Sequence, residues 1–375
     1  MNVGIVCEFN PFHNGHAYLL KNAKELCGGN VICAMSGNFV QRGEYASADK
    51  KTRAKWAVEN GADIVLENPF PFSCATAEKF ALGAVKILVA SSLCDALAFG
   101  CEDNVSENEL YSVAEVILSD SFIKAVKKRI SEDKSISFAK AREEEIKTLL
   151  GEKAAALIAT PNSLLAVEYA KACLTLKKRP ALYPILRKGS MHDGEPSGIY
   201  ASASSIRQDI SLSELYCPEN VSEVLMRDGI TVCNSENFYR ALCPYILFGD
   251  EKDIKKTAEL PHEYVHKLKE AVYECDTFES FFESLRAKHI TDAKLRRMLI
   301  YLLTRTEKEE LSSLPESAML LAVSESGAKQ IRQYKKNGGE LAILSRLSDI
   351  KKLGGKERAR YEKQTVCEKM FERLK

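Results

Sequence analysis

The sequence predicts an α/β fold in which a doubly wound parallel β-sheet is followed by a mainly α-helical C-terminal half. Three observations support this prediction. Short apolar segments alternate with helical patterns over the first hundred residues, as strands and crossover helices do in a parallel sheet. Polar or glycine-bearing motifs directly follow the apolar segments, where ligands bind in such sheets. Strand patterns fade after about residue 212, and helical patterns dominate from there.

Four short apolar segments are predicted to form strands of this sheet, at residues 3–7, 31–35, 63–67 and 96–99. Helical patterns lie between them at 15–27, 49–60 and 75–91. The motifs that follow the strands contain His13, Ser36-Gly37-Asn38, Asn68-Pro69 and Gly100. Because the carboxyl ends of parallel strands share one edge of a sheet, we expect these motifs to converge there.

Further elements extend this unit. Residues 106–150 are helical and highly charged, which indicates an insertion or a flanking helical layer. A helix is predicted from 163 to 174, after a proline that suits an early helical position. A strand at 181–186 and a helix that begins near the hydroxyl-rich run 202–205 complete the unit. We therefore expect a first domain over residues 1–212, with its insertion at about 106–150, and a helical second domain over residues 213–375.

The composition predicts a soluble, cytoplasmic protein. No apolar run approaches the roughly twenty residues that a membrane span requires, and the start lacks the basic region and cleavage site of a signal peptide. The twelve cysteines are spread singly, without a Cys-x-x-Cys pair, so we interpret them as free core residues in a reducing compartment.

The formal charge is close to balanced overall but uneven along the chain. Residues 331–375 hold thirteen Lys and Arg against six Asp and Glu, although the whole chain has a net charge of only +1. Such a basic end is a candidate contact for a polyanion. A lysine-rich helix that only faces solvent would show the same excess of basic residues.

The most informative motif joins the first strand to the first helix, where residues 8–16 read Glu-Phe-Asn-Pro-Phe-His-Asn-Gly-His. His13 and His16 are three apart and share one face at the helix N-terminus, where unpaired N–H groups attract phosphate. Gly15 lets a nucleotide approach closely. Two histidines on a helix are often just polar surface residues, but the preceding strand and the following apolar helix favour a functional motif.

This His-x-Gly-His motif resembles the signature of the HIGH-type nucleotidyltransferases, which have a Rossmann-like sheet, bind ATP and form adenylates. The run from Ser202 to Arg207 resembles the second signature of that superfamily. Residues 35–44, Asp49-Lys50, Arg53, 66–69, 99–102, 161–164 and His192-Asp193 follow in one order. Together these motifs resemble the bacterial tRNA(Met) cytidine acetate ligase family over nearly the whole chain.

The resemblance implies an ATP-dependent ligase that forms a carbon–nitrogen bond. Acetate would be activated as acetyl-adenylate, and the acetyl group would pass to the wobble cytidine of elongator tRNA(Met) to form N4-acetylcytidine. The resemblance implies ATP as a substrate, with Mg²⁺ carried on its phosphates rather than in a dedicated metal site. It implies contact with acetate and tRNA, without a membrane or an obligate protein partner.

The resemblance also implies particular site residues, with His13 and His16 as the catalytic pair. The nucleotide site would comprise Cys7, Glu8, Phe9, Asn10, Pro11, Phe12, His13, Asn14, Gly15, His16, Ala17, Tyr18, Leu19, Leu20, Gly100, Asn162 and Arg187. The last three could instead be a plain strand end, a helix cap and a surface charge. Gln41, Arg42 and Glu44 are placed to meet acetate or a cytosine edge, and Arg42 would supply the charge unless it is simply an exposed loop residue.

Two other functions stay open, a nucleotidyltransferase acting on a small metabolite and a catalytically silent RNA-binding protein. The first needs only residues 1–210 and leaves the basic helical half unexplained, whereas the intact histidines and Gly100 argue against the second. The sequence leaves open how the anticodon is recognised, which group accepts the proton during acetyl transfer, and the oligomeric state. The role of His192 is also open, because the loop after Arg187 is one residue shorter than is usual in the family.

Overall fold

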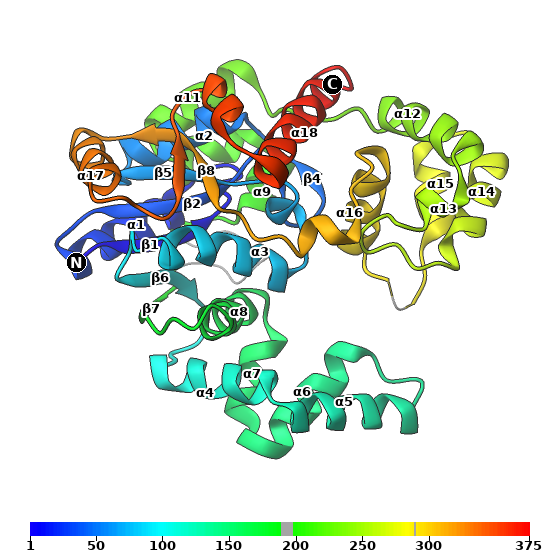
Figure 1. Cartoon of the computed structure of the whole chain (residues 1–375), viewed down its shortest axis with the longest axis horizontal. Coiled ribbons are helices and arrows are strands. Elements are labelled where there is room, and N and C mark those ends of the chain that lie inside the picture. The colour runs from blue at the N-terminus through cyan, green and yellow to red at the C-terminus, as the bar shows by residue number, and fades with distance from the viewer. Residues whose placement is uncertain (189–197, 289) are drawn as a thin grey trace.

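The computed structural model describes residues 1–188, 198–288 and 290–375. Its centre is a seven-stranded sheet of order β7-β6-β1-β2-β5-β8-β9 (Figure 1). The strands are β1 (Val3–Cys7), β2 (Val31–Ser36), β5 (Ile64–Asn68), β6 (Ala96–Cys101), β7 (Ala181–Leu186), β8 (Ser317–Val323) and β9 (Ala342–Leu344). Neighbouring strands are parallel except β5 and β8. The predicted parallel sheet and its five early strands are thus confirmed.

The chain enters this sheet in the middle. From β1, the strands β2 and β5 are added on one side, and β6 and β7 on the other. The order therefore reverses between β1 and β6, and in such sheets this reversal opens a crevice beyond the carboxyl ends of the two strands.

Both faces of the sheet are buried by helices. Along β2, Ile32 and Ala34 belong to one apolar core and Cys33 and Met35 to the other, as expected when successive side chains alternate between two covered faces. The first core is closed by α3 (Ala77–Val85), α4 (Glu107–Leu118) and α8 (Pro161–Thr175). The second is closed by α1 (Asn14–Cys27), α2 (Lys50–Glu59) and α11 (Glu219–Asp228).

A helical layer projects from one end of the sheet, below β6 and β7 in Figure 1. Besides α4 it consists of α5 (Asp120–Glu132), α6 (Phe138–Leu150) and α7 (Glu152–Ala159). Arg129 joins α5 to α6 through ion pairs with Glu144 and Glu145 at 3.2 and 2.9 Å. The segment predicted to be a charged helical insertion or flanking layer is helical, and its first helix, α4, packs against the sheet.

A second group of helices lies to the right of the sheet in Figure 1. We call it the helical lobe; it comprises α12 (Ser235–Phe248), α13 (Glu251–Ile254), α14 (Tyr264–Glu274), α15 (Phe278–Leu285) and α16 (Asp292–Leu303). Its apolar core includes Phe39 and Phe70 from the first unit and Phe371 from α18 (Gly355–Glu372). The lobe is therefore packed onto the sheet-bearing part of the chain.

Strands β8 and β9 interrupt the C-terminal half, residues 213–375, which the sequence predicts to be mainly helical. The segment Ser317–Val323 is rich in alanine, leucine and methionine, which also suit a helix, and it becomes a strand by pairing with the free edge of β5. Residues 317–323 and 342–344 therefore belong to the sheet. A boundary at residue 212 does not separate sheet from helices.

Helix α18 is tied to the carboxyl end of β5. Gln364 on this helix donates a hydrogen bond to the buried carboxylate of Glu67 at 2.7 Å and accepts one from the Phe70 N–H at 3.1 Å. Lys50 bridges Glu67 and Glu368 at 2.8 and 2.7 Å. Helix α18, which belongs to the basic C-terminal segment and is preceded by α17 (Glu325–Lys336), is thus anchored in the edge that carries the site motifs.

No helix in the described ranges is long and apolar enough to cross a membrane. The twelve cysteines are free thiols and most are buried, which agrees with their interpretation as core residues.

The loop that follows β2 contacts the helical lobe at Gly43. This glycine has φ +78°, and a Cβ on it would lie 2.6 Å from the Arg297 backbone nitrogen in α16. We expect Gly43→Ala to lower the free energy of unfolding by about 2 kcal/mol or more, from backbone strain and from displacement of the helix. Gly338→Ala is the matched control, since Gly338 has φ +73° and nothing within 4 Å of the added carbon. Equal losses of stability in urea unfolding would show that the contact with α16 contributes nothing.

Candidate active site

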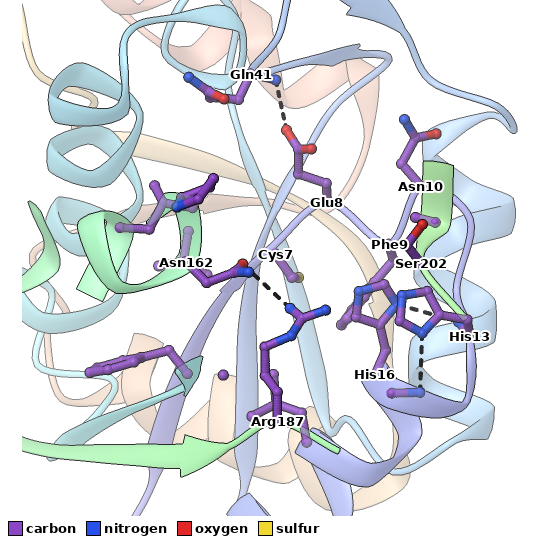
Figure 2. A pocket seen from close by; sticks show the side chains of 18 of the residues that line it. Cys7, Glu8, Phe9, Asn10, His13, His16, Gln41, Asn162, Arg187 and Ser202 are labelled. Atoms are coloured by element: carbon purple, nitrogen blue, oxygen red, sulfur yellow. Dashed lines mark hydrogen bonds between the residues drawn. The ribbon is translucent and has the colours of Figure 1, made fainter. Parts of the chain in front are cut away.

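A cleft of about 370 Å³ lies at the carboxyl ends of β1 and β6 (Figure 2). Residues that line it lie within 6–10, 13–19, 40–44, 77–80, 99–100, 161–169, 185–188 and 200–207. Its position agrees with the edge at which the sequence motifs were expected to converge, and it brings the two HIGH-type signatures into one cavity.

The two histidines are fixed by the start of α1. His13 is the N-cap residue, and its Nδ1 accepts a hydrogen bond from the Gly15 N–H at 3.1 Å. His16 Nδ1 accepts one from the His13 N–H at 3.3 Å, and the two rings stack with centroids 3.7 Å apart. Since each Nδ1 is an acceptor, the proton of each neutral ring is on Nε2. Neither Nε2 has a hydrogen-bond partner among the described residues, so both are available as donors.

Both imidazoles are neutral. Burial, reinforced by the positive charges of Arg187 and Arg207, lowers the pKa of His13 to about 3. Burial also lowers the pKa of His16 well below its ordinary range, with contributions from His13 and Arg187. The motif therefore offers hydrogen-bond donors, and the positive charge in the cleft comes from the arginines.

The stability of the protein is expected to depend on pH through these two histidines. As pH falls below about 6.5, the unfolded chain binds protons on both imidazoles, whereas the folded protein leaves His13 neutral down to about pH 3. The free energy of unfolding should therefore fall as the pH is lowered from about 7 to about 3. Urea unfolding of the wild type and of a His13→Gln, His16→Gln double variant tests this. The double variant should show the shallower pH dependence, and parallel curves would contradict it.

Arg187 and Asn162 lie opposite the histidines (Figure 2), and Gly100 lines the cleft beside Arg187. Arg187 Nη1 donates to Asn162 Oδ1 at 3.3 Å, and Asn162 Nδ2 donates to Glu102 Oε1 at 2.5 Å. A Cβ on Gly100 would lie 3.3 Å from Arg187 Cγ, so the glycine leaves room for this side chain. Burial lowers the pKa of Arg187, and Glu102 opposes that shift. Asn162 lies in the first turn of α8, whose N-cap is Thr160.

The second signature meets the first through Arg207. On the short helix α9 (Ala203–Gln208), Arg207 donates to the backbone oxygen of Asn10 at 2.6 Å and to Ser204 Oγ at 3.4 Å. Ser202 is the N-cap of α9 and its Oγ accepts from the Ser205 N–H at 3.1 Å. The hydroxyl-rich run thus caps a helix and also lines the cleft.

Not every residue expected in the nucleotide site reaches the cleft. Cys7, Glu8, Phe9, Asn10, His13, Gly15, His16, Tyr18, Leu19, Gly100, Asn162 and Arg187 line it, whereas Pro11, Phe12, Asn14, Ala17 and Leu20 do not. Phe12 and Leu20 are fully buried in the apolar core under α1, because that face of the helix packs on the sheet. Asn14 Nδ2 donates to the backbone oxygens of Ile199 and Leu215 at 3.0 and 3.3 Å.

The motifs at the carboxyl ends of β2 and β5 lie next to the cleft but do not form its lining. Ser36, Gly37, Asn38 and Asn68 do not line it. The fully buried Arg53 donates to the backbone oxygens of Glu8, Ser36 and Gly37, and through Nε to that of Ala48 at 2.9 Å. Arg53 thereby joins the ends of β1 and β2, a role for which the sequence offers no signal beyond the motif itself.

Gln41, Arg42 and Glu44 line the cleft as expected. The loop that carries them is held by the helical lobe, since Glu44 forms an ion pair with Arg296 at 3.2 Å. Arg297 is fixed by Glu259 at 2.7 Å and donates to the Gln41 backbone oxygen at 3.5 Å. This edge of the cleft is therefore positioned from the second half of the chain.

Phe80 and Tyr169 also line the cleft, although the sequence pattern gave them no functional role. The Tyr169 and Phe99 rings lie 5.5 Å apart, between centroids, and form an apolar wall. Tyr169 is seven residues after Asn162 on α8 and so lies on the same helix face, which is the one signal that could have identified it. His192 and the rest of residues 189–197 lie outside the described residues.

The described residues contain no group of three or more His, Cys, Asp or Glu side chains that could hold a metal ion. The cleft offers instead neutral N–H donors, three arginines and a lysine, side-chain amides and an apolar wall. This combination suits an anionic ligand with an attached aromatic ring.

Comparison with known proteins assigns the class of this fold and site. A family model described as HIGH Nucleotidyl Transferase matches residues 1–374. The chain is a HIGH nucleotidyl transferase, the class to which the sheet and the paired histidines point.

Curated relatives place the chain more closely. A tRNA(Met) cytidine acetate ligase of Thermoanaerobacter sp. (strain X514) is 33% identical over 366 residues, which covers 93% of this chain and 89% of the relative. One of Streptococcus uberis is 35% identical over 350 residues, with 92% and 89% covered. This chain belongs to the tRNA(Met) cytidine acetate ligase family.

Solved structures agree with this assignment. Thermotoga maritima TmcAL bound with alpha-thio ATP has a TM-score of 0.85 and 26% identity, covering 98% of this chain and 92% of the other. The apo form of the same protein has a TM-score of 0.87 and 27% identity, with the same coverage.

Proposed function

We propose that this protein is an ATP-dependent tRNA(Met) cytidine acetate ligase. It would activate acetate as acetyl-adenylate, release pyrophosphate, and transfer the acetyl group to the wobble cytidine of elongator tRNA(Met) in the cytoplasm. The observation that carries the proposal is the pair of stacked neutral histidines facing Arg187 across one cleft, in a chain of this family. The similarity to a structure that holds an ATP analogue supports ATP as the nucleotide.

In the first half-reaction an acetate oxygen attacks the α-phosphorus of ATP, and pyrophosphate leaves. Negative charge builds on the phosphate oxygens, so positioned donors lower the barrier. His13 and His16 would donate from Nε2, and Arg187 would add positive charge from the opposite wall. Asn162 offers an amide to the nucleoside, and Gly100 leaves space beside it.

Mg²⁺ would enter this reaction on the phosphates of ATP. The described residues contain no metal-binding cluster, and Mg²⁺ commonly keeps several waters while it binds substrate phosphates. It would neutralise part of the phosphate charge, and the histidines and Arg187 would orient the phosphates.

The second half-reaction needs a site for RNA next to the cleft. The loop from residue 40 to 44 lies between the cleft and α16, so the helical lobe borders the acceptor side. The basic segment 331–375 includes α18, which is anchored at the same sheet edge through Gln364. We therefore assign tRNA binding to the second half of the chain, with acetate between the phosphates and the 40–44 loop.

The direct test is incubation of the protein with ATP, acetate and tRNA(Met). We expect acetate-dependent release of pyrophosphate and AMP, and N4-acetylcytidine in the RNA by mass spectrometry. Omission of acetate or ATP should abolish the product. If acetate neither promotes AMP formation nor appears on the RNA, the proposal is wrong, and adenylate formation with another acid would indicate a small-metabolite enzyme.

The salt dependence of tRNA binding tests the basic end. Lys351 and Lys352 are exposed and end the turn before α18. Replacing both with glutamine should weaken binding and lower the slope of log K against log salt by about 1 per lysine. Lys124→Gln with Lys127→Gln is the matched control, because these exposed lysines lie on α5, at the far end of the molecule (Figure 1). An unchanged slope in the first variant would place the RNA elsewhere.

A further inference from the structure

We infer that the Glu8 carboxylate accepts the proton that the exocyclic amine of the wobble cytidine loses during acetyl transfer. The inference rests on the proposed function and assigns a catalytic residue to its second half-reaction. It starts from the one acidic side chain within residues 7–20 and from its surroundings in the cleft.

One oxygen of Glu8 is fixed and the other is free. Oε1 accepts a hydrogen bond from the Gln41 N–H at 2.6 Å and from Ser36 Oγ at 3.4 Å. Oε2 accepts no hydrogen bond from the described residues. It is not among their fully buried polar atoms that lack a partner, so it is accessible from the cleft. Because Glu8 lines the cleft, a held carboxylate presents a free oxygen to a substrate.

The Glu8 carboxylate lies where the cytidine acceptor would bind, rather than where the ATP phosphates would bind. A negative side chain repels a polyphosphate, whose favourable contacts are Arg187 and the two histidines. Figure 2 shows the Glu8 side chain directed toward Gln41 and away from Arg187. Glu8 therefore lies toward the 40–44 loop, which borders the helical lobe.

The helical lobe also controls where Glu8 lies. Gln41, which holds Oε1, accepts a hydrogen bond from Arg297 of α16 through its own backbone oxygen. The lobe that we propose to border the RNA is thus connected, through the backbone of Gln41, to the group that would meet the cytosine edge. Such a connection keeps a base within hydrogen-bond reach of its substrate.

The surroundings of Glu8 also favour a base. Burial raises its pKa, while the Gln41 N–H, Arg53 and Arg207 oppose that rise and Glu44 adds to it. A carboxylate with a raised pKa accepts a proton more readily than an ordinary surface carboxylate, as long as it is ionised before the step.

Acetyl transfer replaces a C–O bond with a C–N bond and moves one proton. The cytidine N4 attacks the carbonyl carbon of acetyl-adenylate and forms the new C–N bond. The N–H proton passes to Glu8 Oε2, and the C–O bond to the phosphate breaks with its electron pair on AMP. The products are N4-acetylcytidine, AMP and a protonated Glu8, which returns its proton to water.

Glu8→Gln tests this assignment when the two half-reactions are measured separately. Acetate-dependent exchange of pyrophosphate with ATP reports the first, and single-turnover transfer from supplied acetyl-adenylate to tRNA(Met) reports the second. We expect transfer to fall about 10²–10⁴-fold, with exchange changed by less than about threefold. Glu8→Asp keeps the charge and should retain part of the transfer rate. Glu25→Gln, at an exposed position on α1, is the control and should change neither rate.

A parallel loss of exchange and transfer would place Glu8 in adenylate formation, for instance on phosphate-bound Mg²⁺, and would overturn the inference. Unchanged transfer in Glu8→Gln would also overturn it. If Glu8→Gln fails to fold, Glu8→Asp must show the selective loss of transfer on its own. A wild-type protein with neither activity would instead refute the proposed function.

Discussion

His13→Ala is expected to slow acetate-dependent adenylate formation by about 10²–10³-fold, the usual cost of removing one positioned donor from a transition state. The expected effect is large because His13 has two roles. Its Nε2 is free to donate into the cleft, and its Nδ1 and N–H hold Gly15 and His16 in place. His16→Ala removes only a donor and one capping contact, so its loss should be similar or smaller.

Pyrophosphate exchange and tRNA affinity, measured on the same preparations, check this prediction. Exchange should fall while the affinity for tRNA stays within about twofold, because we place the RNA on the second half of the chain. His266→Ala is the control, since His266 is exposed on α14. An exchange rate within about threefold of the wild type would show that the paired histidines are structural.

Arg53→Ala is expected to lower the free energy of unfolding by about 3–5 kcal/mol, the range seen when one partner of a buried charged network is removed. The guanidinium is completely buried and donates to the backbone oxygens of Glu8, Ser36, Gly37 and Ala48. Without it, these buried acceptors lose a partner, at about 1–3 kcal/mol for each that water cannot reach. The change also leaves a cavity beneath the cleft.

Chemical unfolding at one pH measures this loss. Lys55→Ala is the matched control on the same helix, because Lys55 is 73% exposed and its ion pair with Glu59 contributes little. A loss below about 1 kcal/mol for Arg53→Ala would mean that water or other donors replace the guanidinium. In that case the ends of β1 and β2 would be held by the sheet alone.

Much of the sheet was predictable because its signals are local. The early strands are short apolar runs whose two faces are both buried, as Ile32 and Cys33 illustrate on β2. The strand β8 was not predictable, because its residues suit a helix and the deciding contact is with β5, some 250 residues earlier. Local pattern does not report such long-range pairing.

In the candidate site, too, the local features were predictable and those that depend on the folded chain were not. The spacing of His13 and His16 predicts a shared face, and the structure stacks the two rings. The state of the rings was not predictable, because neutrality results from burial by the folded chain. The role of Arg53 was equally unpredictable, because an arginine on a polar helix is ordinarily expected to be exposed.

The return of the chain to the sheet after the helical lobe limits how this protein can be divided. A fragment that ends near residue 212 would leave β5 with an open hydrogen-bonding edge and would uncover apolar residues such as Phe39 and Phe70. Such a fragment should aggregate and should not survive as a minimal adenylating enzyme. The nucleotide-binding part and the part assigned to RNA therefore form one folding unit, and their functions must be separated by point substitution.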